Sequence, residues 1–508
     1  MSRINTNLPS LIAQRVLASQ NKTLAGSLER LSTGLAINRG SDNPAGLIAS
    51  EGLRSDKVSI AAAIGNAERA DQVINITEGG LHEINELLMH IQGLVTESAN
   101  DASLSAAERN ANQLQVDAII QAIDRISATT SFQDTKLLNG ALDYTVVNQD
   151  AAVAATQINS AKLVIGKTRD VSAVVTASAQ RGVLFLSANN NSLALNNTGA
   201  NFTFEIAGTK GTREFAFASG VSLANMRDVI NGVAGATGVE ASVFGTAIRL
   251  KSEAYGSSEF VSVKVIDDAG INAGGGGATA GIYGAASTDE DVPRVVANTL
   301  FSAADGSNAI RDSGQDISVI INGIVAVGDG KVASVKSELL DLDIEFTNAG
   351  ATSLATIDAY TIQGGGAKFL IGPSVDINNE VAIGIGNMAA RSLGKYGVGF
   401  IDDLGTGKDY AVGNGDLVTA QAIVDHAIMQ VSKLRGRLGA FQKNTIGSSV
   451  RTLGIAFENI SAAESLIRDT DFASETARLT RAQVLVSAAT NVLAIANTQP
   501  QSVLALIG

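Results

Sequence analysis

Residues 60–95 read IAAAIGNAERADQVINITEGGLHEINELLMHIQGLV, and this stretch decides the fold of the two ends of the chain. Within it, small or apolar residues follow one another in alternating steps of three and four. They are Ala63, Ala67, Ala70, Ile74, Thr77, Leu81, Ile84, Leu88, Ile91 and Val95. A repeat of 3.5 residues places them all on one helix face. The stretch therefore predicts a long helix of the coiled-coil type, which needs a partner to cover this N-terminal seam.

A matching pattern lies near the other end of the chain. The same spacing is kept by Leu417, Ala420, Val424, Ala427, Val431, Leu434, Leu438 and Phe441, and after a Gly-Ser break it resumes at Leu453, Ala456, Ile460, Ala463 and Ile467. We call this the C-terminal seam. The two seams are the obvious partners for each other.

Each extreme end carries a thinner amphipathic stretch. Near the start it consists of Leu17, Leu24, Leu28, Leu31 and Leu35, and near the finish of Ala482, Leu485, Ala489, Val492 and Ala496. Pro500 is expected to end the second helix, because proline has no N–H to donate and clashes with the preceding turn. These two terminal stripes offer about one apolar residue per turn.

Between about Thr145 and Gly384 the pattern changes to short alternating runs separated by Gly, Asn and Ser. Residues 201–208, NFTFEIAG, and 316–323, DISVIING, are examples. Such runs predict strands and turns. The fold class is therefore α+β: coiled-coil-like terminal arms packed together, with a β-rich region inserted between them.

The composition excludes several classes of function. The 508 residues include 50 Asp and Glu against 37 Lys and Arg, with no basic cluster, so neither nucleic acid nor an anionic membrane is an expected partner. No cysteine is present, which removes disulfides and thiolate sites. The first eleven residues lack the pattern of a secretory signal, and no uninterrupted apolar run is long enough for a membrane span. We therefore expect no membrane insertion and no cleaved signal peptide.

Candidate chemistry is sparse. Only three histidines occur, and His82-Glu83 begins a zinc-protease pattern that needs a second histidine four positions after the first. That position holds Glu86, so both imidazoles cannot reach one ion from a single helix face. The sequence therefore predicts no catalytic residues, no metal and no cofactor, and we do not expect the chain to be an enzyme.

Two terminal segments carry a family resemblance. Residues 31–50, LSTGLAINRGSDNPAGLIAS, and 457–473, FENISAAESLIRDTDFA, resemble bacterial flagellin. The likeness extends over about residues 1–145 and 385–508. In the middle, residues 222–231 with 247–252 resemble a repeat found in the insertions of flagellins and hook-associated proteins.

The resemblance implies a subunit that self-assembles into the flagellar filament, the helical propeller for swimming. By analogy, residues 1–45 and 465–508 form the inner core of the filament and 46–145 with 385–464 a helical-bundle outer core. Residues 146–384 then form a variable, β-rich, surface-exposed region that could comprise two subdomains. The self-assembly and seam residues are Leu24, Leu28, Leu31, Leu35, Ile74, Leu81, Ile84, Leu88, Ile91, Val431, Leu434, Leu438, Leu485 and Val492.

The implied partners are further copies of the chain, the hook-associated junction and cap proteins, and a flagellar export chaperone. A host innate-immune flagellin receptor is expected to bind weakly. Stimulatory flagellins present Gln-Arg followed by Leu, whereas the matching residues here are Met89, His90 and Leu94. Two alternatives stay open: a hook-filament junction protein, and a filament subunit whose middle region adds an adhesive role. The implied location is extracellular, in the flagellum.

Overall fold

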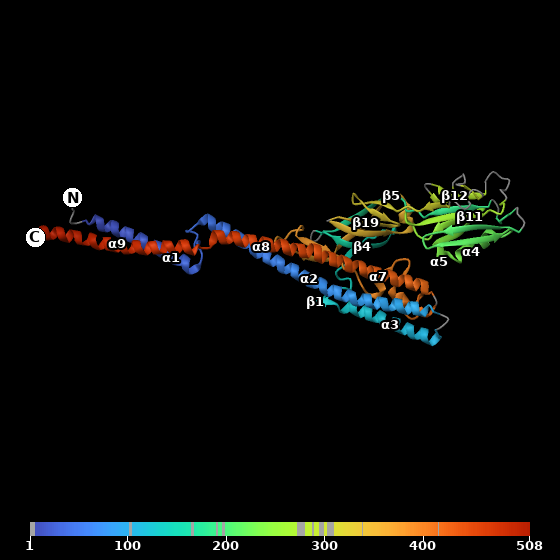
Figure 1. Ribbon diagram of the computed structural model, residues 1–508, viewed down its shortest axis with the longest axis horizontal. Helices are drawn as coiled ribbons and strands as arrows, with labels where there is room; N and C mark the ends of the chain where they lie inside the picture. Colours follow the sequence, from blue (N-terminus) through green and yellow to red (C-terminus); the bar gives the residue numbers. More distant parts are fainter. Residues whose placement is uncertain are drawn as a thin grey trace. The chain divides into compact units, whose positions relative to one another are not determined.

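The computed structural model describes the chain except residues 1–5, 101–103, 164–166, 189–190, 196–198, 272–279, 287–288, 294–298, 302–308, 338, 415 and 508. It contains helices at both ends of the chain and a β-rich middle, which confirms the predicted α+β class (Figure 1). The chain divides into two compact units. The first comprises Met1–Asn75, Phe369–Glu380 and Arg437–Gly508, and the second comprises Ile76–Lys368 and Val381–Gly436.

The first unit begins with helix α1 (Leu8–Thr33), which runs antiparallel to α9 (Phe472–Ile507). Asn7 caps the start of α1 by accepting a hydrogen bond from the Ser10 backbone N–H at 3.1 Å. Gly34 ends the helix with a φ of +74°, a conformation that glycine adopts without strain. Beyond it, the Ala36 N–H donates to the Arg468 carbonyl at 2.7 Å, so the end of α1 lies beside the start of α9.

The same unit contains the first part of α2 (Pro44–Ser98) and all of α8 (Gly447–Arg468). Proline is favourable at the first position of α2, because the N–H that it lacks would have no partner within the helix there. Ile60, Ala63 and Leu453 form a small buried cluster between the two helices. Its flank is closed by an ion pair between Lys57 and Glu464 at 3.1 Å.

The second unit contains the rest of α2, together with α3 (Ala106–Thr129) and most of α7 (Leu417–Ala440), up to Gly436. Helix α3 starts with a capping box, in which Ser105 and Glu108 satisfy each other's backbone N–H groups. The buried Gln113 of α3 donates to the Leu404 carbonyl at 2.9 Å and accepts from the Val412 N–H at 2.7 Å. These bonds attach an irregular segment to the helical part of the unit.

The Gly-Ser break in the spacing of the C-terminal seam does not end the helix. A π-helical segment, η5 (Phe441–Ile446), joins α7 to α8, and Gly447 is already helical. The inward residues Phe441 and Ile446 are five apart, because a π turn accommodates one extra residue without ending the helix. Gln442 holds this segment on α2 by donating to Asp71 Oδ1 at 2.8 Å and Asn75 Oδ1 at 2.9 Å.

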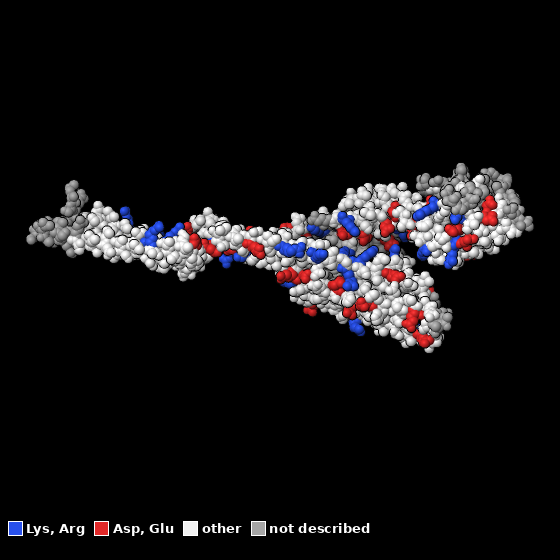
Figure 2. All heavy atoms as spheres, viewed as in Figure 1, with Lys and Arg blue, Asp and Glu red and all other residues white. Residues whose placement is uncertain are grey.

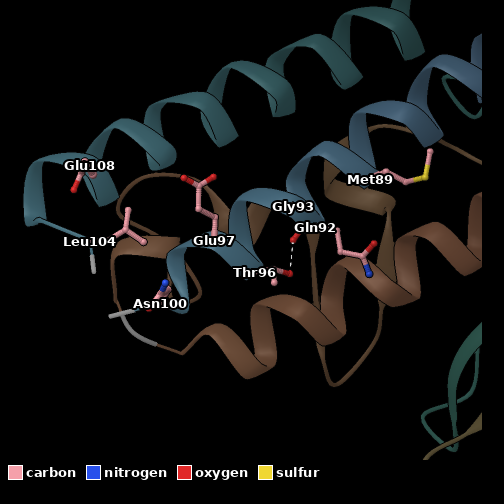
Figure 3. A pocket seen from close by; sticks show the side chains of 8 residues that line it. All are labelled: Met89, Gln92, Gly93, Thr96, Glu97, Asn100, Leu104 and Glu108. Carbon is pink, nitrogen blue, oxygen red and sulfur yellow. Dashed lines mark hydrogen bonds between the residues drawn. The ribbon is translucent and has the colours of Figure 1, made fainter. Parts of the chain in front are cut away.

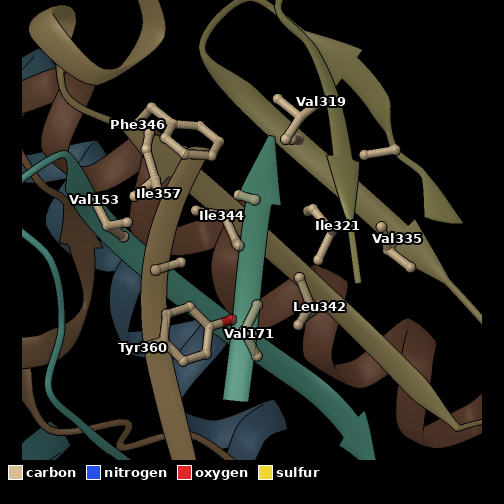
Figure 4. Close-up of a cluster of buried hydrophobic side chains, with 14 of the residues drawn as sticks. Val153, Val171, Val319, Ile321, Val335, Leu342, Ile344, Phe346, Ile357 and Tyr360 are labelled. Carbon is tan, nitrogen blue, oxygen red and sulfur yellow. The ribbon is translucent and has the colours of Figure 1, made fainter. Parts of the chain in front are cut away.

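The β-rich middle contains two antiparallel packings, each made of two sheets. The first packing encloses a cluster of buried side chains that includes Val171, Leu342, Phe346 and Tyr360 (Figure 4). One of its sheets has the order β17-β16-β5-β21-β3, with bounds Ile324–Val325, Ser318–Ile321, Arg169–Ala177, Thr356–Gly365 and Tyr144–Val147. The other has the order β18-β19-β20-β4, with bounds Val327–Asp329, Val332–Lys336, Leu340–Phe346 and Val153–Ala161.

Strand β20 shows why these residues form a sheet. It reads LDLDIEF, and its apolar residues are buried in strict alternation with half-buried acids. Successive strand side chains point to opposite faces, so this pattern places one face on the core and the other toward solvent.

The second packing is filled by a cluster that includes Phe202, Phe204, Phe215 and Phe217. Its sheets have the orders β13-β12-β6-β10-β9, with β14 also on β12, and β15-β11-β7-β8. Their bounds are Asp289–Pro293, Gly281–Ala286, Val183–Ser187, Ala247–Ser252, Val239–Phe244, Thr299–Leu300, Ile310–Ser313, Phe260–Asp267, Asn201–Ala207 and Thr212–Ala218. Helix α4 (Leu223–Asn231) covers this core with Leu223, Met226 and Ile230.

The remaining elements are short. They are β1 (Ser131–Phe132), β2 (Thr135–Lys136), α5 (Ala234–Thr237), α6 (Asn348–Thr352), β22 (Ala367–Leu370), β23 (Glu380–Ile383), η2 (Ala390–Ser392), β24 (Gly394–Lys395), β25 (Gly399–Phe400), η3 (Ile401–Leu404) and η4 (Val412–Asn414).

Candidate assembly surfaces

The first turn of α1 is tied to the last turns of α9. The Asn7 side-chain amide donates to the Ala496 carbonyl at 2.8 Å. Ala496 lies four residues before Pro500, which has no N–H to give to that carbonyl. Asn7 therefore supplies the donor that the proline lacks, and α9 continues to Ile507. The prediction that Pro500 ends the helix is wrong for this reason.

The inward faces of α1 and α9 are narrow and partly polar. The least exposed residues of α1 are Ser10, Ala13, Leu17, Gln20, Leu24, Ser27 and Leu31, and those of α9 are Glu475, Leu479, Ala482, Val486, Ala489, Leu493 and Ala496. Small and polar residues dominate both sets. The pair consequently buries little apolar surface in a single chain.

A buried carboxylate lies in this contact. The Glu475 side chain is only 4% exposed, and it pairs with Arg30 of α1 at 3.8 Å and with Arg478 at 3.4 Å. A buried charge is tolerated only when it is paired, so this group fixes where α1 lies along α9. The sequence pattern did not identify Glu475, because this residue lies in the first turn of α9, before Ala482, the first residue of the predicted stripe.

The outward faces of the same two helices are apolar. Exposed side chains on α1 are Leu8, Leu11, Ile12, Val16 and Leu28, and those on α9 are Phe472, Val484, Leu485, Val492 and Ile495. Figure 2 shows few charged side chains along these helices on the face that it draws. A pair of helices that exposes this much apolar surface is typical of a protein with further binding partners.

The structure places the predicted terminal stripes in two groups. Leu24, Leu31 and Leu35 are half-buried, whereas Leu28, Leu485 and Val492 are 50%, 43% and 55% exposed. On α9 the half-buried large apolar residues are Leu479, Val486 and Leu493, whereas Leu485 and Val492, which the sequence predicts to be self-assembly residues, are exposed. Both faces of α9 are apolar, and spacing alone could not tell which one α1 covers.

The long N-terminal seam is buried throughout. Thr77, Leu81, Ile84, Leu88 and Ile91 are each 0% exposed, and Ile74 is 1% exposed. Across from it, Val431 and Leu438 are also 0% exposed and Leu434 is 2% exposed. The structure therefore buries all ten residues of the N-terminal seam, whereas the C-terminal seam is only partly buried: Leu417, Phe441, Ala456, Ile460, Ala463 and Ile467 are half-buried.

Polar pairs flank the long seam. Glu78 pairs with Arg435 at 2.8 Å, and Gln92 donates to Asp425 Oδ1 at 2.7 Å. Because a residue further along α2 pairs with one earlier in α7, the two helices run antiparallel. These contacts set the register of a seam whose apolar residues are otherwise similar to one another.

Met89, His90 and Leu94 lie on α2 outside the buried seam. Met89 is 41% exposed, His90 is exposed and Leu94 is half-buried. Met89 also lines an open groove between α2 and the start of α3, together with Gly93, Thr96 and Leu104 (Figure 3).

The described residues hold no group of three or more His, Asp or Glu side chains arranged to bind a metal. His82, the candidate for a zinc ligand, is exposed on α2.

One segment of α9, Phe472–Thr498, is long and apolar enough to cross a membrane, and 17% of its most apolar stretch is buried. This segment contains no uninterrupted apolar run, because α9 mixes Ser, Thr and Ala with larger residues, so it differs from the expectation of no membrane-length segment. Length and composition do not distinguish a membrane span from a helix whose apolar faces are covered by other protein.

Comparison with known proteins gives matches along the whole chain. Residues 4–143 match the bacterial flagellin N-terminal helical region, and residues 421–507 match the bacterial flagellin C-terminal helical region. Residues 201–252 match the flagellin hook IN motif, which confirms the resemblance seen in the middle of the chain. Flagellin from Salmonella choleraesuis is 28% identical, and flagellin B from Helicobacter pylori is 24% identical, each over 99% of both chains. The solved structure of FliC from Burkholderia pseudomallei covers 74% of this chain and 99% of its own, at 13% identity and a TM-score of 0.23.

The fold and its surfaces define a class of protein: a subunit with paired terminal helices, outward apolar faces and an inserted β-rich region, built to bind further protein. The two terminal matches then identify the family. The chain belongs to the bacterial flagellins, the structural subunits that assemble into the extracellular flagellar filament.

Proposed function

We propose that this flagellin polymerises through its terminal helix pair, with residues 1–45 and 465–508 forming the inner core of the filament. Residues 46–145 and 385–464 then form the outer core, and residues 146–384 lie on the filament surface. The observation that carries this proposal is the outward apolar face of α1 and α9.

The energies favour polymerisation at these helices. Burying one Val, Leu or Ile side chain contributes about 1.5–3 kcal/mol, whereas association costs about 4–15 kcal/mol in lost freedom. The exposed set includes Leu11, Val16, Leu485, Val492 and Ile495. Each of these side chains is already partly buried and gives only part of that value, so the cost of association is offset only when many of them are covered together, as neighbouring copies on several sides would do.

Truncation tests the proposal directly. Removing residues 1–45 or 465–508 should leave a folded monomer that does not polymerise. Circular dichroism and sedimentation after seeding with filament fragments would measure the two properties. Filaments formed by either truncated chain would rule out the terminal pair as the polymerising surface.

Two other readings make different predictions for the same material. A hook-filament junction protein shares the terminal helices but does not elongate indefinitely, so seeded growth to long filaments would exclude it. An adhesive role of residues 146–384 predicts that replacing them with a short linker abolishes binding to a surface while filaments still form.

We propose further that the chain has no catalytic activity and holds no metal or cofactor, and that it leaves the cell without a cleaved signal peptide. The partners proposed besides other copies are the hook-associated junction and cap proteins and an export chaperone. We propose no membrane insertion: neighbouring subunits, not lipid, cover α9 in the filament. Flotation of the monomer with lipid vesicles would contradict this last point.

Recognition by the innate-immune flagellin receptor is proposed to be weak. An arginine presents a permanently charged fork of donors, which His90 cannot copy. Losing a charge-assisted hydrogen bond costs about 1.5–3 kcal/mol, or roughly ten- to a hundred-fold in affinity. The double change Met89→Gln with His90→Arg should therefore raise potency in a reporter-cell assay. No gain from it would end this proposal.

A further inference from the structure

The two β packings of the second unit are joined by two short segments of chain. The chain leaves the first packing after β5, forms the strands of the second packing from β6 to β15, and returns at β16. The outgoing segment, 178–182, and the returning segment, 314–317, are paired, because Gln180 and Gln315 exchange backbone hydrogen bonds at 2.8 and 2.9 Å. Two domains connected in this way are expected to move relative to each other unless further contacts hold them.

A loop of the second packing supplies such a contact. Residues 253–259 connect β10 to β11, and the ring of Tyr255 in this loop packs against the buried cluster of the first packing. Two cations approach the ring: the Arg181 guanidinium carbon lies 4.7 Å and Lys331 Nζ 5.8 Å from its centroid. Cations over an aromatic face are attracted by its electrons. We call residues 255–257 the strap, because they cross from one packing to the other.

One carboxylate binds the strap to the first packing. Asp316 Oδ1 accepts hydrogen bonds from the backbone N–H groups of Ser257 at 3.0 Å and of Gly330 at 2.8 Å. Asp316 Oδ2 accepts a third from the Ser257 hydroxyl. Gly330 belongs to the turn between β18 and β19 of the first packing, so a single side chain joins the strap, the returning segment and this turn. Hydrogen bonds to an ionised acceptor are stronger than those between neutral groups.

The Asp316 carboxyl is charged at neutral pH. Burial raises its pKa, but the hydrogen bonds from Ser257 and Gly330 outweigh burial and hold the pKa below the usual value of 3.8. The ionised group has only acceptors, as three donors require, whereas a protonated carboxyl would direct a hydrogen at one of them.

The backbone at this contact is packed too closely for side chains. Gly256 of the strap has a φ of +125°, and a Cβ there would lie 2.9 Å from Asp316 Oδ1. A Cβ on Gly330 would lie 2.7 Å from the Tyr255 carbonyl oxygen. Real Cβ contacts are essentially never shorter than 3.0 Å. Glycine therefore permits the strap and the turn to touch through their backbones.

We propose that the strap, held by Asp316, locks the two β packings together so that they move as one. When the strap is released, the second packing turns about segments 178–182 and 314–317. Both hydrophobic cores survive the release, because the buried residues of each cluster come from its own side of the connection. The lock belongs to the single chain and does not depend on polymerisation.

Spin labels test the lock in the full-length monomer. The protein has no cysteine, so Lys336→Cys on β19 and Thr246→Cys in the turn after β9 provide the two labelling sites, and both side chains are exposed. Pulsed electron paramagnetic resonance then measures the distribution of distances between the two packings. We expect one narrow distribution when Asp316 is present. Asp316→Ala should broaden it, while circular dichroism stays unchanged.

A matched control removes a different aspartate of the same packing. Asp358 lies exposed on β21, away from the strap, and Asp358→Ala should leave the distribution narrow. A distribution as narrow in Asp316→Ala as in this control would overturn the proposal. A broad distribution in the labelled chain without either alanine change would overturn it as well. Neither result bears on polymerisation, which the monomer does not undergo in this measurement.

Two milder variants keep the test decisive if Asp316→Ala does not fold. Ser257→Ala removes one of the three hydrogen bonds and should broaden the distribution less than Asp316→Ala does. Tyr255→Ala leaves the carboxylate in place and should broaden it by removing the ring from the first packing. Because Ser257 acts through Asp316, the double variant should be no broader than Asp316→Ala alone. Narrow distributions in both Ser257→Ala and Tyr255→Ala would contradict the lock.

Discussion

The long α2 seam and the terminal α1–α9 pair follow the same spacing of apolar residues but differ in what one chain buries. Leu81 and Leu88 in the seam are 0% exposed, whereas Leu485 and Val492 in the terminal pair are 43% and 55% exposed. The seam finds its partners within the chain, and the pair does not. Surfaces with the same periodicity therefore differ in role: one stabilises the monomer, and the other is the surface that we propose binds neighbouring copies.

The largest expected effect is at Leu88. Leu88→Asp places a carboxylate without a partner in the seam, which costs several kcal/mol and approaches the whole stability of a small domain, about 5–15 kcal/mol. Thermal unfolding followed by circular dichroism should show loss of the helical transition. An unfolding curve equal to that of the unaltered chain would show that Leu88 does not contribute to the seam.

Val492→Asp sharpens the comparison, because the same substitution is made on the exposed face. The monomer should melt as before, since the carboxylate stays in water. Polymerisation should be lost, since docking would desolvate the charge at a similar cost of several kcal/mol. Sedimentation of seeded samples measures this, and normal filament yield would show that the face at Val492 is not an interface.

The third effect concerns Asn7 and Pro500. Asn7→Asp keeps the acceptor that caps α1 but removes the donor to the Ala496 carbonyl, so we expect a loss of about 1–3 kcal/mol in the stability of the terminal pair. Adding Pro500→Ala restores a backbone donor and should recover part of it. Protease protection of the ends in assembled filaments reports this local stability. Additive effects of the two changes would mean that the side chains are not coupled.

The smallest expected effect is a pH dependence at His426 of α7. Burial lowers the pKa of His426 below its usual value of 6.5, and the nearby Lys395 lowers it further. The folded chain then binds fewer protons than the unfolded chain below pH 6.5, so stability falls as the pH drops through that value. The melting temperature of the chain should fall between pH 7.5 and 5.5, and it should fall less in the His426→Gln variant. An equal loss in both proteins would exclude this group.

The spacing of apolar residues was enough to predict both seams, the arms and the β-rich insertion. A buried face must recur with the period of its element, and that period is visible in the sequence. The alternation in β20 and the steps from Ala63 to Val95 are direct examples.

The bonds that depend on residues far apart in the chain were not visible. Pro500 predicts the end of a helix by its own chemistry, and only the amide of Asn7, 489 residues from Ala496, changes that outcome. Glu475 is another case. A carboxylate on a helix is expected to be exposed to solvent, and only the folded structure brings Arg30 beside it.

The sequence by itself determined the class of each element, the pairing of the two ends and the family, because these follow from local period and motif. Only the tertiary structure decided which face of α9 meets α1 and how η5 absorbs an extra residue. The physical reason is that an apolar residue requires burial without specifying a partner, and the partner is chosen by polar groups and backbone geometry that meet only after the chain has folded.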